Sequence, residues 1–124
     1  MTLMPQKIQS ALPVLLLVSL FAATSAAANE VDAALAAAER AVLAAQSAQP
    51  RGEAAQALEQ ARGQWLAAGE ARRKSDKLRL AEAAAANADL AHAKARLDAA
   101  REAVESRAAR NADLRRRLLV NEGN

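Results

Sequence analysis

A long stretch of this chain contains no residue that breaks a helix. The sequence holds only 3 prolines and 4 glycines, and none of them lies between Ser75 and Leu119. This stretch consists mostly of alanine, leucine, arginine and glutamate, which favour helices. The sequence therefore predicts one helix of about 44 residues, on the order of 66 Å long.

Two shorter helices are expected before the long one. Pro50 and Gly52 separate a helix over about residues 30–48 from a second over about residues 52–68, which Gly69 is expected to cap. Each has apolar residues at i, i+4, i+7, i+11 and i+14, which places one apolar stripe on one helix face. The stripes consist of Val31, Leu35, Ala38, Val42 and Ala45 in the first helix and of Ala54, Leu58, Ala61, Trp65 and Ala68 in the second.

Together the three helices predict an all-α fold, with Ser75 as the expected N-cap of the third and with a disordered tail over residues 121–124. The two short helices span roughly 25 to 29 Å each, less than half of the third. In an up-down-up bundle they cover residues 75 to about 95 and leave the rest projecting. Because large apolar residues are few, a helical hairpin that orders only on binding stays open as the alternative to a folded three-helix bundle.

Residues 1–28 have the pattern of a secretory signal peptide. Lys7 precedes an apolar run over residues 11–23, and small residues follow as far as Ala28. The run of about 13 residues is shorter than the roughly 20 of a membrane-spanning helix, so cleavage after Ala28 is favoured over an uncleaved anchor. No cysteine is present for a disulfide or a lipid anchor. We expect a soluble exported protein, in the periplasm of a Gram-negative bacterium, with a eukaryotic secretory route as the alternative.

Along the expected long helix, apolar residues recur at alternating spacings of three and four. The pattern runs through Ala83, Ala86, Leu90, Ala93, Leu97, Ala100 and Val104. Such a period is typical of a left-handed coiled coil, in which a polar residue at Asn111 would fix register or oligomer number. The expected helix–helix seam consists of Leu90, Leu97, Val104, Asn111, Leu114 and Leu118. The expected partner is a second copy of the chain or another envelope protein.

No constellation in the sequence indicates catalysis, a cofactor or a metal. His92 is the single histidine, expected on the exposed outer face, and without cysteine it belongs to no set of metal ligands. Neither a nucleophile motif nor a glycine-rich phosphate loop is present. We therefore expect no enzyme activity and no small-molecule substrate. Export and the lack of aromatic residues for base stacking argue against nucleic acid as a partner.

The sharpest charge feature is the run Arg115, Arg116 and Arg117, next to Leu118 and Leu119. In a structural role, cations near the end of a helix complement its dipole. In a functional role, the run can contact an acidic partner or phosphate-bearing lipid headgroups. A membrane surface is therefore the second expected kind of partner.

A family resemblance rests on the segment ALEQAR at residues 57–62, the expected glycine turn at Ala68 and Gly69, and LAEAAAANADLAHAKA at residues 80–95. These segments resemble the domain of unknown function family 4398, whose members are alanine- and arginine-rich envelope proteins of Gram-negative bacteria. The chain departs from that pattern because it lacks both the usual Tyr after the turn and a Cys for lipid attachment. The resemblance implies an exported helical envelope protein and transfers no catalytic residue.

These features predict a non-enzymatic, exported helical protein that acts through helix–helix contacts, as an oligomer or an adaptor in the cell envelope. The alternative is a peripheral binder of anionic lipid or lipopolysaccharide that uses Arg115, Arg116 and Arg117.

Overall fold

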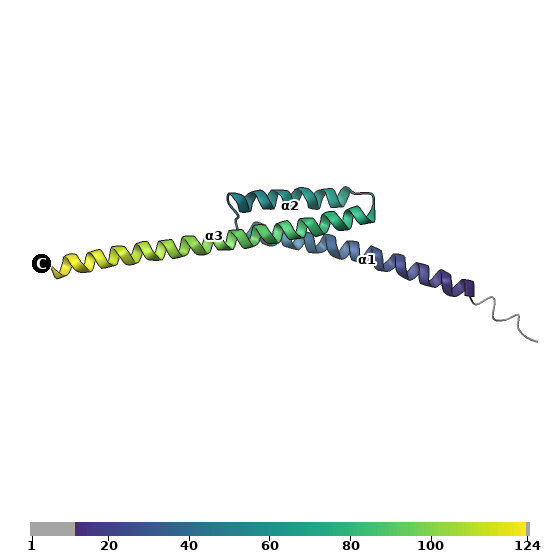
Figure 1. Cartoon of the computed structure of the whole chain (residues 1–124), viewed down its shortest axis with the longest axis horizontal. Coiled ribbons are helices and arrows are strands. Elements are labelled where there is room, and N and C mark those ends of the chain that lie inside the picture. Colours follow the sequence, from purple (N-terminus) through teal and green to yellow (C-terminus); the bar gives the residue numbers. More distant parts are fainter. Residues whose placement is uncertain (1–11, 124) are drawn as a thin grey trace, which may run out of the picture.

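A computed structural model describes residues 12–123 as three helices joined by short loops. The burial of side chains is described from Ala26 onward. They are α1 (Leu12–Ser47), α2 (Glu53–Glu70) and α3 (Lys74–Glu122). Figure 1 shows α2 folded back along α1, and α3 running again in the direction of α1. α3 packs against both other helices, whereas α1 and α2 contact each other much less. The predicted all-α fold with a long third helix is confirmed.

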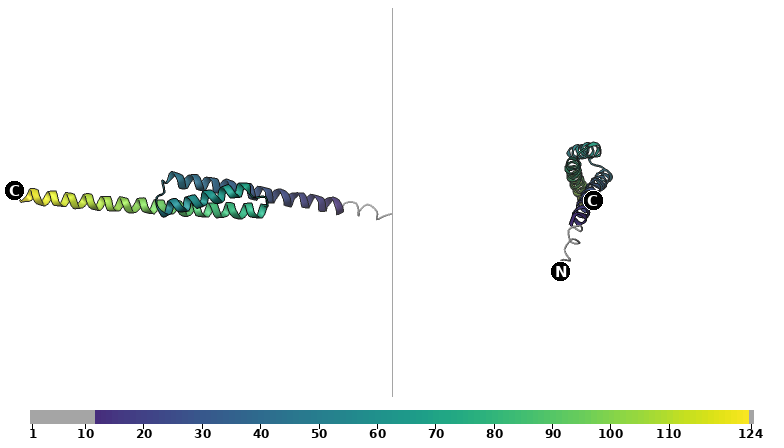
Figure 2. Two further views of the ribbon diagram at one scale, coloured as in Figure 1. Left: turned by 90° about the horizontal axis from the view of Figure 1, so that it is seen from above. Right: turned by 90° about the vertical axis from the view of Figure 1, so that its right-hand side faces the viewer.

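The bundle occupies only part of the length of α1 and α3. The start of α1 and the last part of α3 extend beyond α2 at opposite ends (Figure 2). Ala95 is the last buried residue of α3, so α1 and α2 cover α3 to the position expected from their lengths. Residues 96–122 project beyond the bundle, and we call this segment the arm.

The helix ends differ from expectation mainly at the termini of the chain. Residues 1–11 of the predicted signal peptide and residue 124 lie outside the described residues, and residues 12–28 form the start of α1. α3 continues to Glu122, so residues 121 and 122 are helical although they were expected in a disordered tail.

The connection between α2 and α3 does not use the caps that the sequence indicated. Gly69 lies inside α2, which ends at Glu70, and the C-cap residue is Ala71, whose backbone is extended (φ −61°, ψ 136°). Ser75 lies inside the first turn of α3, where Arg73 is the N-cap residue and forms no side-chain cap. The chain leaves α2 through an extended residue, so it needs no left-handed glycine there.

The connection between α1 and α2 contains two residues with positive φ. Gln49 has φ 51° and Gly52 has φ 54°. The N–H of Gln49 donates to the carbonyl oxygen of Gln46 at 3.0 Å, which closes the end of α1. Glycine adopts such angles without steric cost, whereas a residue with a Cβ does not.

Replacing Gln49 with glycine is therefore expected to raise the free energy of unfolding by about 0.5–1 kcal/mol, because the left-handed conformation loses its steric cost. Urea unfolding followed by circular dichroism measures this change. Gln60→Gly, at an exposed site inside α2, is the matched control and should lower the free energy by about 1 kcal/mol. Equal destabilisation by both changes would contradict the assigned backbone angle.

Two clusters of buried side chains form the core. The first joins Val42 and Ala45 of α1, Leu58 and Ala61 of α2, and Ala88 and Ala91 of α3. The second contains Ala38, Ala68, Ala81 and Ala84, with half-buried Leu35 and Trp65 packed against it. The apolar stripes expected for the first two helices are confirmed, since all their members are buried or half-buried. Trp65 is half-buried and packs against the second cluster from outside.

Polar contacts across the bundle fix α2 along α3. The Asn87 side-chain amide donates to Oε1 of Gln64 at 2.7 Å, in a half-buried position. Nearer the arm, Nζ of Lys94 donates to Oε2 of Glu53 at 3.0 Å. Both contacts join residues of α2 and α3, so they add directional constraints to an interface that is otherwise made of small apolar groups.

α3 contributes only alanine to the core. Its buried residues are Ala81, Ala84, Ala88, Ala91 and Ala95. They repeat at alternating spacings of three and four, like the pattern predicted from Ala83 to Val104. Each of them lies two residues before the corresponding member of that pattern. Two residues turn a helix by about 200°, so the stripe that contains Leu90 lies on nearly the opposite side. Because Val42 and Leu58 already fill the space between α1 and α2, side chains of one carbon let α3 approach both helices.

Candidate helix-docking surface

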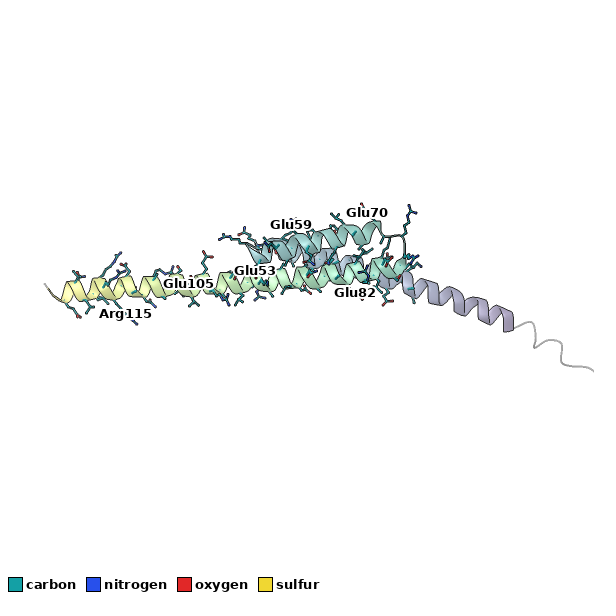
Figure 3. The ribbon with its side chains drawn as sticks, turned by 45° about the horizontal axis from the view of Figure 1, so that its top comes forward. Glu53, Glu59, Glu70, Glu82, Glu105 and Arg115 are labelled. Carbon is teal, nitrogen blue, oxygen red and sulfur yellow. The ribbon has the colours of Figure 1, made fainter. Side chains whose placement is uncertain are left out.

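The arm is a single helix about 40 Å long that no other described part of the chain covers. Every arm residue is exposed except Asp113, which is half-buried. Figure 3 shows side chains around the whole circumference of the arm, with Glu105 near its middle and Arg115 near its end. Because no other described helix packs against the arm, its stability depends on residue choice and on contacts between successive turns.

Contacts between successive turns of the arm involve mainly arginine. Nε of Arg117 lies 2.9 Å from Oδ2 of Asp113, and Arg116 lies 4.0 Å from the same carboxylate. Arg101 lies 4.0 Å from Asp98, and the guanidinium of Arg110 donates to Oγ of Ser106 at 2.8 Å. Such exposed pairs stabilise a helix by about 0.3–0.5 kcal/mol each, so they support the arm without requiring any partner.

The residues of the expected seam form one continuous exposed line, which we call the outer stripe. It consists of Leu90, Leu97, Val104, Asn111, Leu114 and Leu118. The exposed fraction rises from 47% at Leu90, beside the bundle, to 65% at Val104 and 62% at Leu118. The outer stripe therefore begins on the back of the bundle and continues along the arm, which makes it longer than the projecting segment alone.

Charged residues are sorted around the outer stripe. Leu90, Leu97, Val104, Asn111 and Leu118 occupy position a of a seven-residue repeat, and Ala93, Ala100, Arg107 and Leu114 occupy position d. On the arm, the flanking positions e and g hold Arg96, Arg101, Ala103, Ala108, Arg110, Arg115, Arg117 and Glu122. The other acidic residues of the arm are at positions b, c and f, farther from the stripe: Asp98, Glu102, Glu105 and Asp113. This distribution of charges follows from the sequence alone. It is recognised when each residue is assigned to its position in the seven-residue repeat.

The arginine run does not form one patch. Arg115, Arg116 and Arg117 follow one another along a helix, so they point in directions about 100° apart. Arg116 and Arg117 both contact Asp113, and Arg115 forms no ion pair with a described residue. Beside the run, Leu118, Leu119 and Val120 are exposed to 62%, 70% and 67%. The end of the arm therefore combines apolar and basic groups on every side of the helix.

A shallow groove lies where the outer stripe leaves the bundle. Its lining residues are Arg51, Gly52, Glu53, Lys94, Leu97, Asp98 and Arg101. The ion pair between Lys94 and Glu53 is part of this lining, and the hydrogen bond from Lys94 lowers the pKa of the Glu53 carboxyl below its ordinary value of 4.5. Both side chains are accessible to solvent, so the groove is a wet surface feature and not an enclosed cavity.

Replacing Lys94 with methionine is expected to raise the pKa of Glu53 towards 4.5, because the hydrogen bond and the positive charge are both lost. The pair stabilises the fold above the ordinary pKa of Glu53, and this contribution disappears as pH falls through the lowered value. Carbon-13 NMR titration of the Glu53 carboxyl measures the shift. Lys77→Met, at another lysine of α3, is the control, and an identical Glu53 pKa in both variants would contradict the contact.

The described residues contain no group of three or more His, Cys, Asp and Glu side chains that could hold a metal ion. His92 is half-buried on α3, next to buried Ala91, and not on the exposed outer face where it was expected. In the part of the chain that the structure describes, no helix is both long enough and apolar enough to cross a membrane. The outer stripe with its basic flanks is therefore the surface feature with the clearest chemical character.

Comparison of the chain with protein-family models, with curated proteins and with solved structures finds no match. The resemblance to the domain of unknown function family 4398 stays a prediction.

Proposed function

We propose that this is a non-enzymatic, exported helical protein of the cell envelope that acts through helix–helix contacts, as an oligomer or an adaptor. One observation carries the proposal: the outer stripe is exposed along the whole arm, where Leu97, Val104 and Leu118 are 50–65% exposed. Single exposed apolar residues are common on proteins, but a line of them at coiled-coil spacing is a surface that a second helix buries.

The bundle holds the helix from which the arm extends. The same helix supplies Ala81 to Ala95 to the core and then continues into the arm without a break. The polar contacts of Asn87 and Lys94 with α2 hold that helix in place just before the arm begins. In this proposal, the bundle is a base that presents the arm at a fixed angle to its partner.

Export is part of the proposal, and the position of the core supports it. From Ala26 onward, the first buried side chain is Val31, so cleavage after Ala28 would leave every buried residue that the structure describes in the mature protein. We expect the protein isolated from the periplasm of cells expressing the full chain to begin at Asn29. Intact mass spectrometry checks this, and a mass that retains residues 1–28 would contradict the predicted cleavage.

Site-specific photo-crosslinking in cells tests the proposed contact. A photoreactive residue is placed at Val104 on the outer stripe, and at Ala109 on the opposite face of the arm as the matched control; both sites are exposed. Adducts from Val104 but not from Ala109 would support the proposal, and their mass would distinguish an oligomer from an adaptor. Absence of adducts from Val104, or equal adducts from both sites, would overturn it.

A second candidate function is peripheral binding of anionic lipid or lipopolysaccharide. It is favoured by the exposed Leu118, Leu119 and Val120 beside the arginine run. The protein should then co-sediment with vesicles that contain phosphatidylglycerol. Replacing Arg115, Arg116 and Arg117 with glutamine should abolish this co-sedimentation. Binding that survives the triple change would remove the basis for this candidate.

A further inference from the structure

This inference rests on the proposed function and concerns the identity of the partner. We propose that the outer stripe docks an acidic amphipathic helix of another protein, with glutamate or aspartate at the positions that flank its own apolar seam. Neither a second copy of this chain nor a lipid surface fits the arm equally well.

The outer stripe is narrow. From Leu90 to Leu118 the large apolar side chains occupy only positions a and d. Alanine at positions 93 and 100 leaves position d without a large side chain in the first half of the stripe. A stripe confined to a and d is the seam of a coiled coil, whereas a helix that lies in a membrane surface has a broader apolar face. No aromatic residue is present in the described arm to anchor it at a lipid interface. The shape of the stripe therefore favours a helix as its occupant.

The charges beside the stripe are basic on both sides. Of the arm residues at positions e and g, Arg96, Arg101, Arg110, Arg115 and Arg117 are cationic, two are alanine, and Glu122 at the end is the single acid. Residues at these positions contact the flanks of the partner helix and determine which partner is accepted. Complementary charges on the partner are therefore acidic on both sides.

A second copy would place like charges together. In a parallel pair in register, Arg96 faces Arg101 of the other copy and Arg110 faces Arg115. Only Arg117 faces an opposite charge, that of Glu122. In an antiparallel pair, e faces e and g faces g, so the arm again meets mostly arginine and alanine. The acidic residues that could relieve this repulsion lie farther round the helix, and Asp98 and Asp113 already contact Arg101, Arg116 and Arg117. Like-charge contacts of this kind act against the wrong partner.

A polar residue that lies between members of the outer stripe supports the same conclusion. Arg107 occupies position d, between the positions of Ala100 and Leu114, and forms no ion pair with a described residue. A parallel second copy would bring two Arg107 side chains together at the centre of the contact. An acidic side chain on another helix would pair with Arg107 there, as a buried or half-buried cation requires.

The test uses two synthetic four-heptad peptides and the protein expressed from the full sequence. Both peptides have leucine at a and d; one has glutamate at every e and g, and the other has lysine. Fluorescence anisotropy with labelled peptide measures binding at an ionic strength of about 0.15 M. We expect the acidic peptide to bind at least roughly tenfold more tightly than the basic peptide, because its flanks match the arginines of the arm.

Variants of the protein test whether the flanks cause this preference. Combined replacement of Arg96, Arg101, Arg110 and Arg115 with glutamate should invert the preference towards the basic peptide. Arg116→Glu, at position f away from the stripe, is the matched control and should leave it unchanged. Circular dichroism establishes that each variant keeps its helix content.

Four outcomes would overturn the inference. The peptides bind alike; the combined change leaves the preference unaltered; anionic vesicles bind while neither peptide does; or the mass in sedimentation equilibrium rises with concentration in a way that Val104→Ser abolishes. The first, second and fourth outcomes leave the proposed helix–helix contact intact if photo-crosslinks at Val104 persist. Failure of those crosslinks would instead remove the proposed function, so the two failures are distinguishable.

Discussion

Replacing Leu58 with alanine is expected to lower the free energy of unfolding by about 2–5 kcal/mol, the largest effect of any single truncation in this bundle. Leu58 is 4% exposed and belongs to the first core cluster, together with Val42 of α1 and Ala88 of α3. Its neighbours are mostly alanines that cannot extend into the space that it leaves. The loss is a large part of the 5–15 kcal/mol typical of a whole domain.

Urea unfolding followed by circular dichroism at 222 nm, where helices give a strong band, measures this change in the free energy of unfolding. Leu66→Ala is the matched control, because Leu66 lies on the same helix but is 62% exposed, and its replacement should change the free energy by less than about 0.5 kcal/mol. If both changes have equal effects, α2 is not packed as described. Leu58 would then be no more important than an exposed leucine.

Replacing Ala88 with leucine is expected to lower the free energy of unfolding by about 1–3 kcal/mol. Ala88 is fully buried where α3 meets both other helices, and the added carbons have no room unless α3 moves away. Such a movement would also strain the contacts of Asn87 and Lys94 with α2. Overpacking therefore tests the claim that alanine is used here for close approach.

The same unfolding experiment measures this effect, with Ala86→Leu as the control. Ala86 is exposed on α3, two residues away, and leucine there should be tolerated or slightly stabilising because it remains a strong helix former. A stable Ala88→Leu variant would mean that α3 can move away from α1 and α2 without loss. The alanine face would then reflect helix propensity alone.

The number, order and approximate ends of the helices could be predicted because breakers are rare in this sequence and therefore informative. Pro50 and Gly52 separate α1 from α2 as expected. The cap predicted at Gly69 was wrong, because a glycine can lie inside a helix when an extended residue such as Ala71 forms the C-cap. Local residue preferences predict where a helix is interrupted better than they predict which residue caps it.

The face of α3 that joins the bundle could not be read from the sequence. α3 carries two stripes with the same spacing, one of alanine alone and one that alternates alanine with larger residues, and the larger residues dominate any search for a core. The choice depends on how much volume α1 and α2 already supply, which is a property of the packed bundle and not of α3. By contrast, the residues of the outer stripe could be listed in full from their period.

The uninterrupted course of α3 also has a geometric consequence. The angular phase between the bundle and the outer stripe depends only on the number of residues between them. One residue inserted after Ala99 would rotate everything beyond it by about 100°, so Val104 and Leu118 would leave the line of Leu90 and Leu97. Seven inserted residues would lengthen the reach by about 10 Å and rotate it by only about 20°. The length of the arm can therefore change by whole heptads, whereas smaller insertions and deletions would turn the outer stripe away from the proposed partner.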